Sequence, residues 1–208
     1  MVDRADRLTA PDSSGAQGPD PAQGPDPAQA LVPGLVPESE LERRLARDPV
    51  LLEGWAWGTP RQGHPEGSVG VHVGDLLRTI EEWGEVGDRR SELRLLALVH
   101  DSLKFQVSNR LPKAGRNDHA VRARLFAEDY TDDERLLSTI EQHDRPYQIW
   151  RRLRRAGRPD ERAFARMLES VPDLSLFLRF VELDGSTAGK NPEPVDWFRG
   201  ELRRRRPV

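Results

Sequence analysis

The spacing of apolar residues from Ser39 to the C-terminus constrains the fold more than any other feature of the sequence. These residues recur at intervals of three and four positions, which places them on one face of an α-helix. No five-residue run alternates apolar and polar residues as a half-buried strand would. We expect helices over residues 39–56, 67–84, 90–103, 118–129, 132–156, 160–170, 173–186 and 193–203. The pattern therefore predicts an all-α fold, in which residues 39–208 form a single compact helical bundle.

Two short patterns indicate where helices begin. Ser39 with Glu42, and Thr131 with Glu134, have the spacing of a capping box. In that motif a hydroxyl accepts a hydrogen bond from a backbone N–H of the first helical turn. We therefore expect one helix to begin after Ser39 and another after Thr131.

Residues 1–38 have a different composition. They hold seven of the seventeen prolines, no aromatic residue, and two copies of Ala-Gln-Gly-Pro-Asp-Pro, at 16–21 and 22–27. A segment of this kind cannot bury enough apolar surface to offset the entropy lost on ordering. We predict a disordered tail that serves as a solvated extension, with a proline-rich ligand as the alternative.

Charge and composition exclude several classes of protein. The net charge is −3, and because residues 1–38 carry six acidic and two basic residues, the other 29 acidic and 30 basic residues nearly cancel. A near-neutral domain gives no general reason to expect a nucleic-acid partner. No run approaches the roughly 20 apolar residues of a spanning helix, so we expect no membrane contact. The N-terminus lacks the apolar segment of a secretory signal, so we expect a cytoplasmic protein.

The five histidines all lie between residues 64 and 143, and the chain has no cysteine. Four of them and two aspartates fall within, or at the end of, inward-facing apolar helix faces: His72, His100, Asp101, His119, His143 and Asp184. A single buried histidine is usually satisfied by a hydrogen bond, whereas a metal ion would satisfy all six residues together. Nitrogen and oxygen ligands without a thiolate fit Mn, Fe, Co, Ni or Mg.

The order of these residues resembles the HD superfamily of metal-dependent phosphohydrolases. The resemblance covers about residues 60–190 and includes His72, the adjacent pair His100-Asp101, and Asp184 on a late helix. Lys104 follows the pair as it does in the family. The run 64–69 (His-Pro-Glu-Gly-Ser-Val) resembles the approach to the first ligand helix in HD domains attached to tRNA nucleotidyltransferases.

The resemblance implies a helical bundle with the metal site in its middle. His72, His100, Asp101 and Asp184 would hold one divalent metal ion, and Asp101 would bridge to a second ion. In the dinuclear branches of the family two further histidines follow the pair, and His119 and His143 match their positions. In mononuclear members such histidines contact the substrate phosphate instead.

The ligand types indicate hydrolysis by metal-activated water, because a bound metal lowers the pKa of water and neutralises charge on a phosphoryl oxygen. Asp101 and Lys104 are the expected catalytic residues, and Lys104 would also hold a phosphate as a point charge. Four further residues are candidates for substrate contact: His64, Arg110, Lys113 and Arg116. A solvated loop is the alternative for the three cations at 110–116.

The expected function is therefore that of a phosphomonoesterase or phosphodiesterase acting on a nucleotide or a related small phosphate ester. Two alternatives stay open, a dinuclear iron oxygenase of the same superfamily and a metal-containing regulatory module without activity. The arginines at 151–155 and 203–206 would suit RNA or polyphosphate, but a charged helix face is the simpler interpretation.

Overall fold

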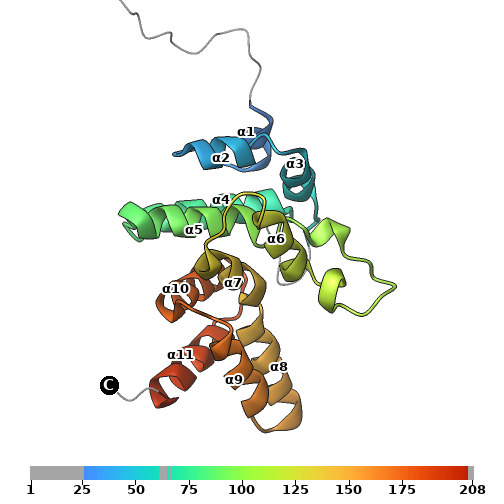
Figure 1. The fold of residues 1–208 in the computed structure, drawn as a ribbon, viewed down its shortest axis with the longest axis vertical. Helices are drawn as coiled ribbons and strands as arrows, with labels where there is room; N and C mark the ends of the chain where they lie inside the picture. Colours follow the sequence, from blue (N-terminus) through green and yellow to red (C-terminus); the bar gives the residue numbers. More distant parts are fainter. Residues whose placement is uncertain (1–25, 61–64, 66, 206–208) are drawn as a thin grey trace, which may run out of the picture.

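Helix α10 (Leu174–Gly185) is shared by the two hydrophobic clusters that the described residues form. The computed structural model describes residues 26–60, 65 and 67–205. Leu176, Phe180 and Leu183 of α10 belong to the larger cluster, whereas Phe177 and Val181 belong to the smaller one. Figure 1 shows α10 between α5 above it and α11 below it. One helix therefore connects the two halves of the hydrophobic core.

The larger cluster is built from the first helices of the chain together with α10. These are α1 (Pro27–Leu31), α2 (Glu40–Leu45), α3 (Pro49–Ala56), α4 (Val69–Glu82), α5 (Gly87–Val99), α6 (His119–Ala127) and α7 (Glu134–Gln142). Helices α4 and α5 lie side by side, with α3 packed on α4 and α7 packed on α5 (Figure 1). Helix α10 contacts both α4 and α5, so its C-terminal end is brought to the middle of this group.

The smaller cluster joins α10 to the last part of the chain. It includes α8 (Arg145–Ala156), α9 (Glu161–Glu169) and α11 (Glu193–Arg205), with α8 packed against both α9 and α11. Phe164, Phe177 and Phe198 are at most 1% exposed at its centre. The Phe177 and Phe198 rings meet edge to face with centroids 5.8 Å apart, a favourable aromatic arrangement.

The structure confirms the all-α fold, since residues 26–60 and 67–205 contain no strand. Two of the expected helices are each divided in two. The segment 39–56 breaks before Pro49, the first residue of α3, and the segment 132–156 breaks at His143 and Asp144, just before Pro146. Because proline has no N–H to donate, it fits the first turn of a helix and not the interior. No helix within the described ranges has both the length and the apolarity to cross a bilayer.

One of the two predicted capping patterns is correct. Ser39 Oγ accepts a hydrogen bond from the backbone N–H of Glu42 at 3.1 Å, and α2 begins at Glu40, directly after Ser39. The prediction for Thr131 is wrong, because α7 begins at Glu134 with Asp133 as its cap. The Thr131 hydroxyl instead accepts from the N–H of Asp133 at 3.1 Å and shapes the turn before the helix.

The prediction of a disordered tail over residues 1–38 is wrong for residues 26–38. This segment contains α1, and Ala28, Val32 and Leu35 are at most 2% exposed within the larger cluster. The segment lies so close to α4 that a Cβ at Gly70 would stand 2.3 Å from the carbonyl oxygen of Leu31. The helical domain therefore includes residues 26–38, and residues 1–25 lie outside the described part of the chain.

A buried ion pair fixes the end of this segment. Arg94 of α5 donates two hydrogen bonds of 2.8 Å, one to each oxygen of the Glu42 carboxylate, and a third of 2.9 Å to the carbonyl oxygen of Val36. Both charged side chains are at most 4% exposed, so each needs the other. The pair ties residues 36–42 to α5, the helix that leads into His100.

Candidate metal centre

Six histidine and aspartate side chains meet where α4, α5, α6, α7 and α10 come together. They are the six that the sequence predicts, namely His72, His100, Asp101, His119, His143 and Asp184, and we call them the His/Asp cluster. Potential ligand atoms of His72, His100 and Asp101 all lie within 4.8 Å of one another. The same holds for Asp101, His119 and His143. Asp101 is therefore common to two groups of three ligand-type residues.

Most members of the cluster lie at helix ends. His100 follows the last residue of α5, His143 follows the last residue of α7, and His119 is the first residue of α6. The Asp118 carboxylate caps α6 by accepting from the N–H of Ala120 at 3.0 Å, which sets where His119 stands. Because several helices begin or end at one place, residues far apart in the sequence converge there.

The His100-Asp101 pair is held at the end of α5 by contacts with α3. Trp55 Nε1 donates a 3.0 Å hydrogen bond to the carbonyl oxygen of Leu98, and the Ser102 hydroxyl donates to the same oxygen at 2.7 Å. The backbones approach closely because Gly54 has no side chain, and a Cβ there would lie 1.9 Å from the carbonyl oxygen of Ser102. Tertiary packing, and not the helix alone, therefore positions the pair.

Backbone carbonyls determine which ring nitrogen of two histidines is available to the cluster. His100 Nδ1 lies 3.2 Å from the carbonyl oxygens of Leu96 and Ala97, and His143 Nδ1 lies 2.8 Å from that of Ile140. A nitrogen beside a carbonyl oxygen carries the proton of the neutral ring. The Nε2 lone pair of each ring is thus left free to bind a metal, and the carbonyl contact fixes the orientation of the ring.

Three buried atoms of the cluster have no hydrogen-bond partner among the described residues. They are His72 Nδ1, His100 Nε2 and Asp101 Oδ1. An unpaired buried polar atom costs about 1–3 kcal/mol, so three in one place call for a compensating group. A divalent cation accepts imidazole nitrogen and carboxylate oxygen together. The residues present therefore fit a metal ion.

Opposite charges shift the pKa values in the cluster. Burial acts to lower the pKa of His100, but Asp101 and Asp184 outweigh it and raise the pKa to about 9. Burial acts to raise the pKa of Asp101, but Lys104 and His100 hold it well below the usual value. For Asp184, burial is likewise outweighed, first by Lys190 and then by the neighbouring histidines. A metal ion that binds His100 must therefore displace a proton.

His72 is in a different protonation state. Burial lowers its pKa by more than the hydrogen bond with Asp184 raises it. The ring is therefore neutral near pH 7, which is the form that binds a metal ion. Its Nε2 lies 3.0 Å from Asp184 Oδ1, so α4 and α10 each supply one side of this contact.

A cavity of about 480 Å³ opens beside the cluster. Two lysines approach carboxylates of the cluster there: Lys104 Nζ contacts Asp101 Oδ2, and Lys190 Nζ lies 2.6 Å from Asp184 Oδ1. The remaining wall is largely apolar and includes Pro146, Tyr147, Val181, Pro194 and Val195. A cavity with a few polar groups at one end and an apolar wall is typical of a small-molecule site.

Three residues of this site are absent from the sequence prediction: Asp144, Tyr147 and Lys190. Asp144 Oδ2 lies 3.4 Å from His119 Nε2. Burial acts to lower the pKa of His143, but Asp144 and Asp101 together outweigh it and raise that pKa. The second His-Asp pair, at 143–144, is the one sequence signal for Asp144. Tyr147 and Lys190 belong to no motif and reach the cavity through α8 and through the loop after α10.

The structure does not bring every predicted substrate residue to the cavity. Arg110, Lys113 and Arg116 are exposed and do not line it. Their loop is folded onto itself by Asn117, whose side chain accepts from the N–H of Ser108 and donates to the carbonyl oxygens of residues 108, 111 and 112. The remaining candidate, His64, lies outside the described residues.

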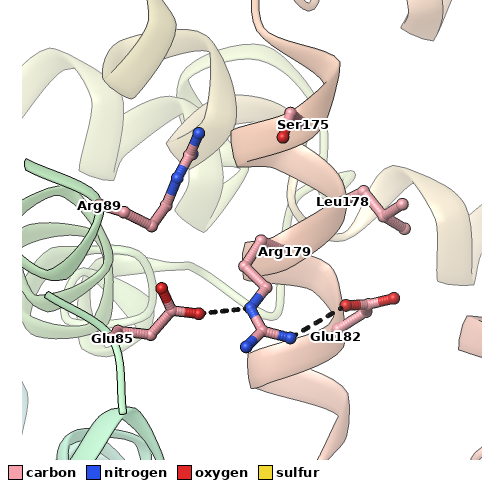
Figure 2. A pocket seen from close by; sticks show the side chains of 6 residues that line it. All are labelled: Glu85, Arg89, Ser175, Leu178, Arg179 and Glu182. Atoms are coloured by element: carbon pink, nitrogen blue, oxygen red, sulfur yellow. Dashed lines mark hydrogen bonds and ion pairs between the residues drawn. The ribbon is translucent and has the colours of Figure 1, made fainter. Parts of the chain in front are cut away.

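A second cavity, of about 390 Å³, lies between α10 and the turn after α4. Figure 2 shows Arg179 between two carboxylates, with Nε 2.6 Å from Glu85 and a second contact of 3.6 Å to Glu182. The Arg179 guanidinium also lies 3.8 Å from the ring centroid of Trp83. Its charge is already matched by these neighbours, and we assign no ligand to this cavity.

Comparisons of the chain with protein-family models, with curated proteins and with solved structures find no match. The interpretation of the cluster therefore depends on its geometry. The arrangement offers nitrogen and oxygen ligands for one or two divalent ions, beside a cavity that holds two ammonium groups.

Proposed function

We propose that the protein is a metal-dependent phosphohydrolase of the HD type that acts on a nucleotide or a related phosphate ester. The observation that carries this proposal is the sharing of Asp101 between two groups of histidines, beside a cavity that Lys104 and Lys190 enter. This combination of a cation site with adjacent ammonium groups suits the negative charge of a phosphoryl group.

In this proposal His72, His100, Asp101 and Asp184 hold the first divalent ion. Asp101, His119 and His143 would hold a second ion. When bound, such a metal lowers the pKa of a coordinated water and neutralises charge on a phosphoryl oxygen. The backbone carbonyls beside His100 and His143 keep the Nε2 atoms of both rings directed at the cluster.

The two lysines bind the phosphate of the substrate. A metal ion held by Asp101 and Asp184 would leave Lys104 and Lys190, which contact these carboxylates, available to pair with phosphate oxygens. Burial acts to lower the pKa of Lys104, but Asp101 and Asp144 outweigh it and raise that pKa, so the ammonium stays charged. The apolar wall formed by Pro146, Tyr147 and Val195 receives the organic part of the ester.

A panel assay tests the proposal. The full chain is loaded separately with Mn²⁺, Fe²⁺, Co²⁺, Ni²⁺ and Mg²⁺ and given mononucleotides, cyclic nucleotides, dinucleoside polyphosphates and sugar phosphates. We expect release of phosphate or of a nucleoside monophosphate with at least one metal, and loss of that activity in His100→Gln. The exposed Asp88, at the other end of α5, provides the control, because Asp88→Asn leaves the cluster intact. Turnover that is equal in His100→Gln and wild type would contradict the assignment.

A dinuclear iron oxygenase is the second candidate, and the Asp101 shared by two ligand groups is the observation that favours it. Such an enzyme would use the same six residues but consume dioxygen. Oxygen uptake by the iron-loaded protein, without phosphate release from any ester of the panel, would favour this second candidate. A chain that holds metal and shows neither activity would be a regulatory module.

A further inference from the structure

Two aromatic and two arginine side chains share one face of α8, where Trp150 is half-buried and the other three are exposed. The Tyr147 and Trp150 rings stack with centroids 6.0 Å apart and planes inclined by 24°. Arg151 lies over the Tyr147 ring at 5.6 Å, and Arg154 lies over the Trp150 ring at 5.9 Å. We call these four residues the α8 strip. Seven positions separate its ends, so it runs for about 10 Å along the helix.

The positive charge of this face is not balanced by neighbouring carboxylates. Helix α8 contains no acidic residue. Arg152 pairs with Asp160 at 3.3 Å, but among the described residues no carboxylate oxygen lies within 4.0 Å of Arg151, Arg154 or Arg155. These three arginines are exposed. The face therefore attracts a polyanion, although the whole chain has a net charge of −3.

The α8 strip is continuous with the cavity beside the His/Asp cluster. Tyr147 lines that cavity and is also the first residue of the strip. Its side chain is 44% exposed, so the ring retains surface for a further aromatic group. A long ligand that follows the strip would therefore reach Lys104 and the cluster at its end.

We propose that the α8 strip binds single-stranded nucleic acid and leads one end of the strand into the cavity. Tyr147 and Trp150 stack with unpaired bases, and Arg151 and Arg154 pair with phosphates of the same strand. Only an unpaired base can present its face to an aromatic side chain, which selects a single strand over a duplex. Delivery of the terminal phosphate to Lys104 depends on the function proposed above, whereas binding along the strip does not.

Other polyanions fit the strip less well. A lipid surface needs a wide exposed apolar face, but Pro146 and Ile149 of α8 are buried and Leu153 is half-buried, so apart from the two rings α8 exposes no large apolar side chain. An acidic peptide would pair with the arginines but has no use for two stacked rings. Two neighbouring rings with a guanidinium group over each offer both stacking surface and phosphate-binding groups to a single strand.

Binding is measured by fluorescence anisotropy with a labelled deoxythymidine oligomer of about 12 nucleotides. The full chain is kept in a metal chelator, so no hydrolysis occurs and the result is independent of the proposed activity. We expect affinity to fall steeply with salt. Arg151→Ala/Arg154→Ala should weaken binding at least about tenfold and reduce the slope of log affinity against log salt by about 1.4, the value for two phosphate contacts on a single strand.

The chain offers a matched control. Arg44 and Arg47 are also exposed and three positions apart, and Arg44 lies over the Tyr130 ring at 5.1 Å. Arg44→Ala/Arg47→Ala removes the same charge from α2 and the turn after it, and should leave oligomer affinity within about twofold of wild type. Tyr147→Leu, which keeps the apolar volume, should weaken binding about fivefold or more through lost stacking.

Three outcomes would overturn the proposal. The first is no binding by the wild-type protein, or tighter binding of anionic lipid vesicles than of the oligomer. The second is an equal loss in the α2 and α8 double variants, which would indicate attraction by net charge alone. The third is displacement of the oligomer by polyglutamate or by duplex DNA of the same length as readily as by unlabelled single strand.

Discussion

His72 Nε2 lies 3.0 Å from Asp184 Oδ1, although 112 residues separate the two in the chain. The contact joins the first turn of α4 to the last turn of α10 and completes the His/Asp cluster. It depends on the packing of α10 against both α4 and α5. The packing of the larger hydrophobic cluster therefore positions the proposed metal ligands, and substitutions in that cluster should alter the geometry of the site.

The stability of the metal-free protein should fall as the pH rises from 6.5 to 9. The folded pKa of His100 is about 9, above the ordinary histidine value of 6.5, because Asp101 and Asp184 outweigh burial. A raised histidine pKa contributes stability that is fully present below the unfolded pKa and is lost as the pH passes the folded one. His143 is shifted in the same direction, and His72, whose pKa is lowered, changes the stability only below 6.5.

Urea unfolding of chelator-treated protein across this pH range measures the effect. Saturating divalent metal should remove the fall, because the metal takes the place of the proton. A metal-free unfolding midpoint that stays level or rises between pH 6.5 and 9 would show that His100 is not protonated in the folded cluster.

Gly70→Ala should destabilise the protein by about 1–3 kcal/mol, the usual cost of forcing extra volume into a packed core. The added Cβ would stand 2.3 Å from the Leu31 carbonyl oxygen and 3.0 Å from that of Trp55, and both are backbone atoms with little freedom to move. Gly200→Ala is the matched control, since a Cβ there meets nothing within 4 Å on α11. That substitution should stabilise by about 0.5–1 kcal/mol through helix propensity. Equal urea midpoints for the two variants would argue against the close packing of residues 27–31 on α4.

Removal of residues 1–38 should destabilise the chain by several kcal/mol relative to removal of residues 1–25. The longer truncation takes away the fully buried Val32 and Leu35, each worth about 1.5–3 kcal/mol. It also leaves Arg94 without the Val36 carbonyl oxygen. Thermal melts of both truncated proteins measure the difference, and coincident melting curves would mean that residues 26–38 contribute nothing to the fold.

Substitution of the cavity lysines should affect substrate binding more than metal binding. We expect Lys104→Ala and Lys190→Ala each to raise KM for phosphate esters about tenfold or more, in line with the loss of a charge-assisted hydrogen bond. Lys190→Arg, which keeps the charge, should recover part of the loss. Bound metal, measured in parallel, should stay at the wild-type level, and its loss from either alanine variant would assign that lysine to the support of the ligands instead.

Sequence patterns predicted the helices and the meeting of the six cluster residues, because amphipathic spacing is local and placed those residues on inward-facing helix faces. They failed where structure depends on partners distant in the chain. Val32 and Leu35 lie in a proline-rich segment whose composition suggests disorder, and they are buried because the segment packs against other helices of the larger cluster, α3 and α4 among them. Lys190 and Asp144 line the cavity only because the start of α8 and the loop after α10 pack beside the His/Asp cluster.

The loop 105–117 and helix α8 illustrate the same limit. Lys113 and Arg116 follow the ligand pair closely in sequence, yet Asn117 folds their loop so that both side chains face solvent. The net charge of the chain likewise gives no indication that Arg151 and Arg154 of the α8 strip lack a carboxylate partner among the described residues. Pairing depends on which carboxylates lie nearby in the folded protein. Proximity in sequence and mean charge are weak guides to what surrounds a side chain.

The central claim is that the His/Asp cluster binds metal, and metal content per chain after reconstitution and desalting tests it most directly. Asp101→Asn keeps the shape of the residue common to both ligand groups but removes its charge, while Asp88→Asn makes the same change on the exposed end of α5. We predict at least one equivalent of divalent metal in the wild-type protein and in Asp88→Asn, and loss of most of it from Asp101→Asn. Equal metal content in the two variants, or none in the wild type after loading with each candidate ion, would contradict the account.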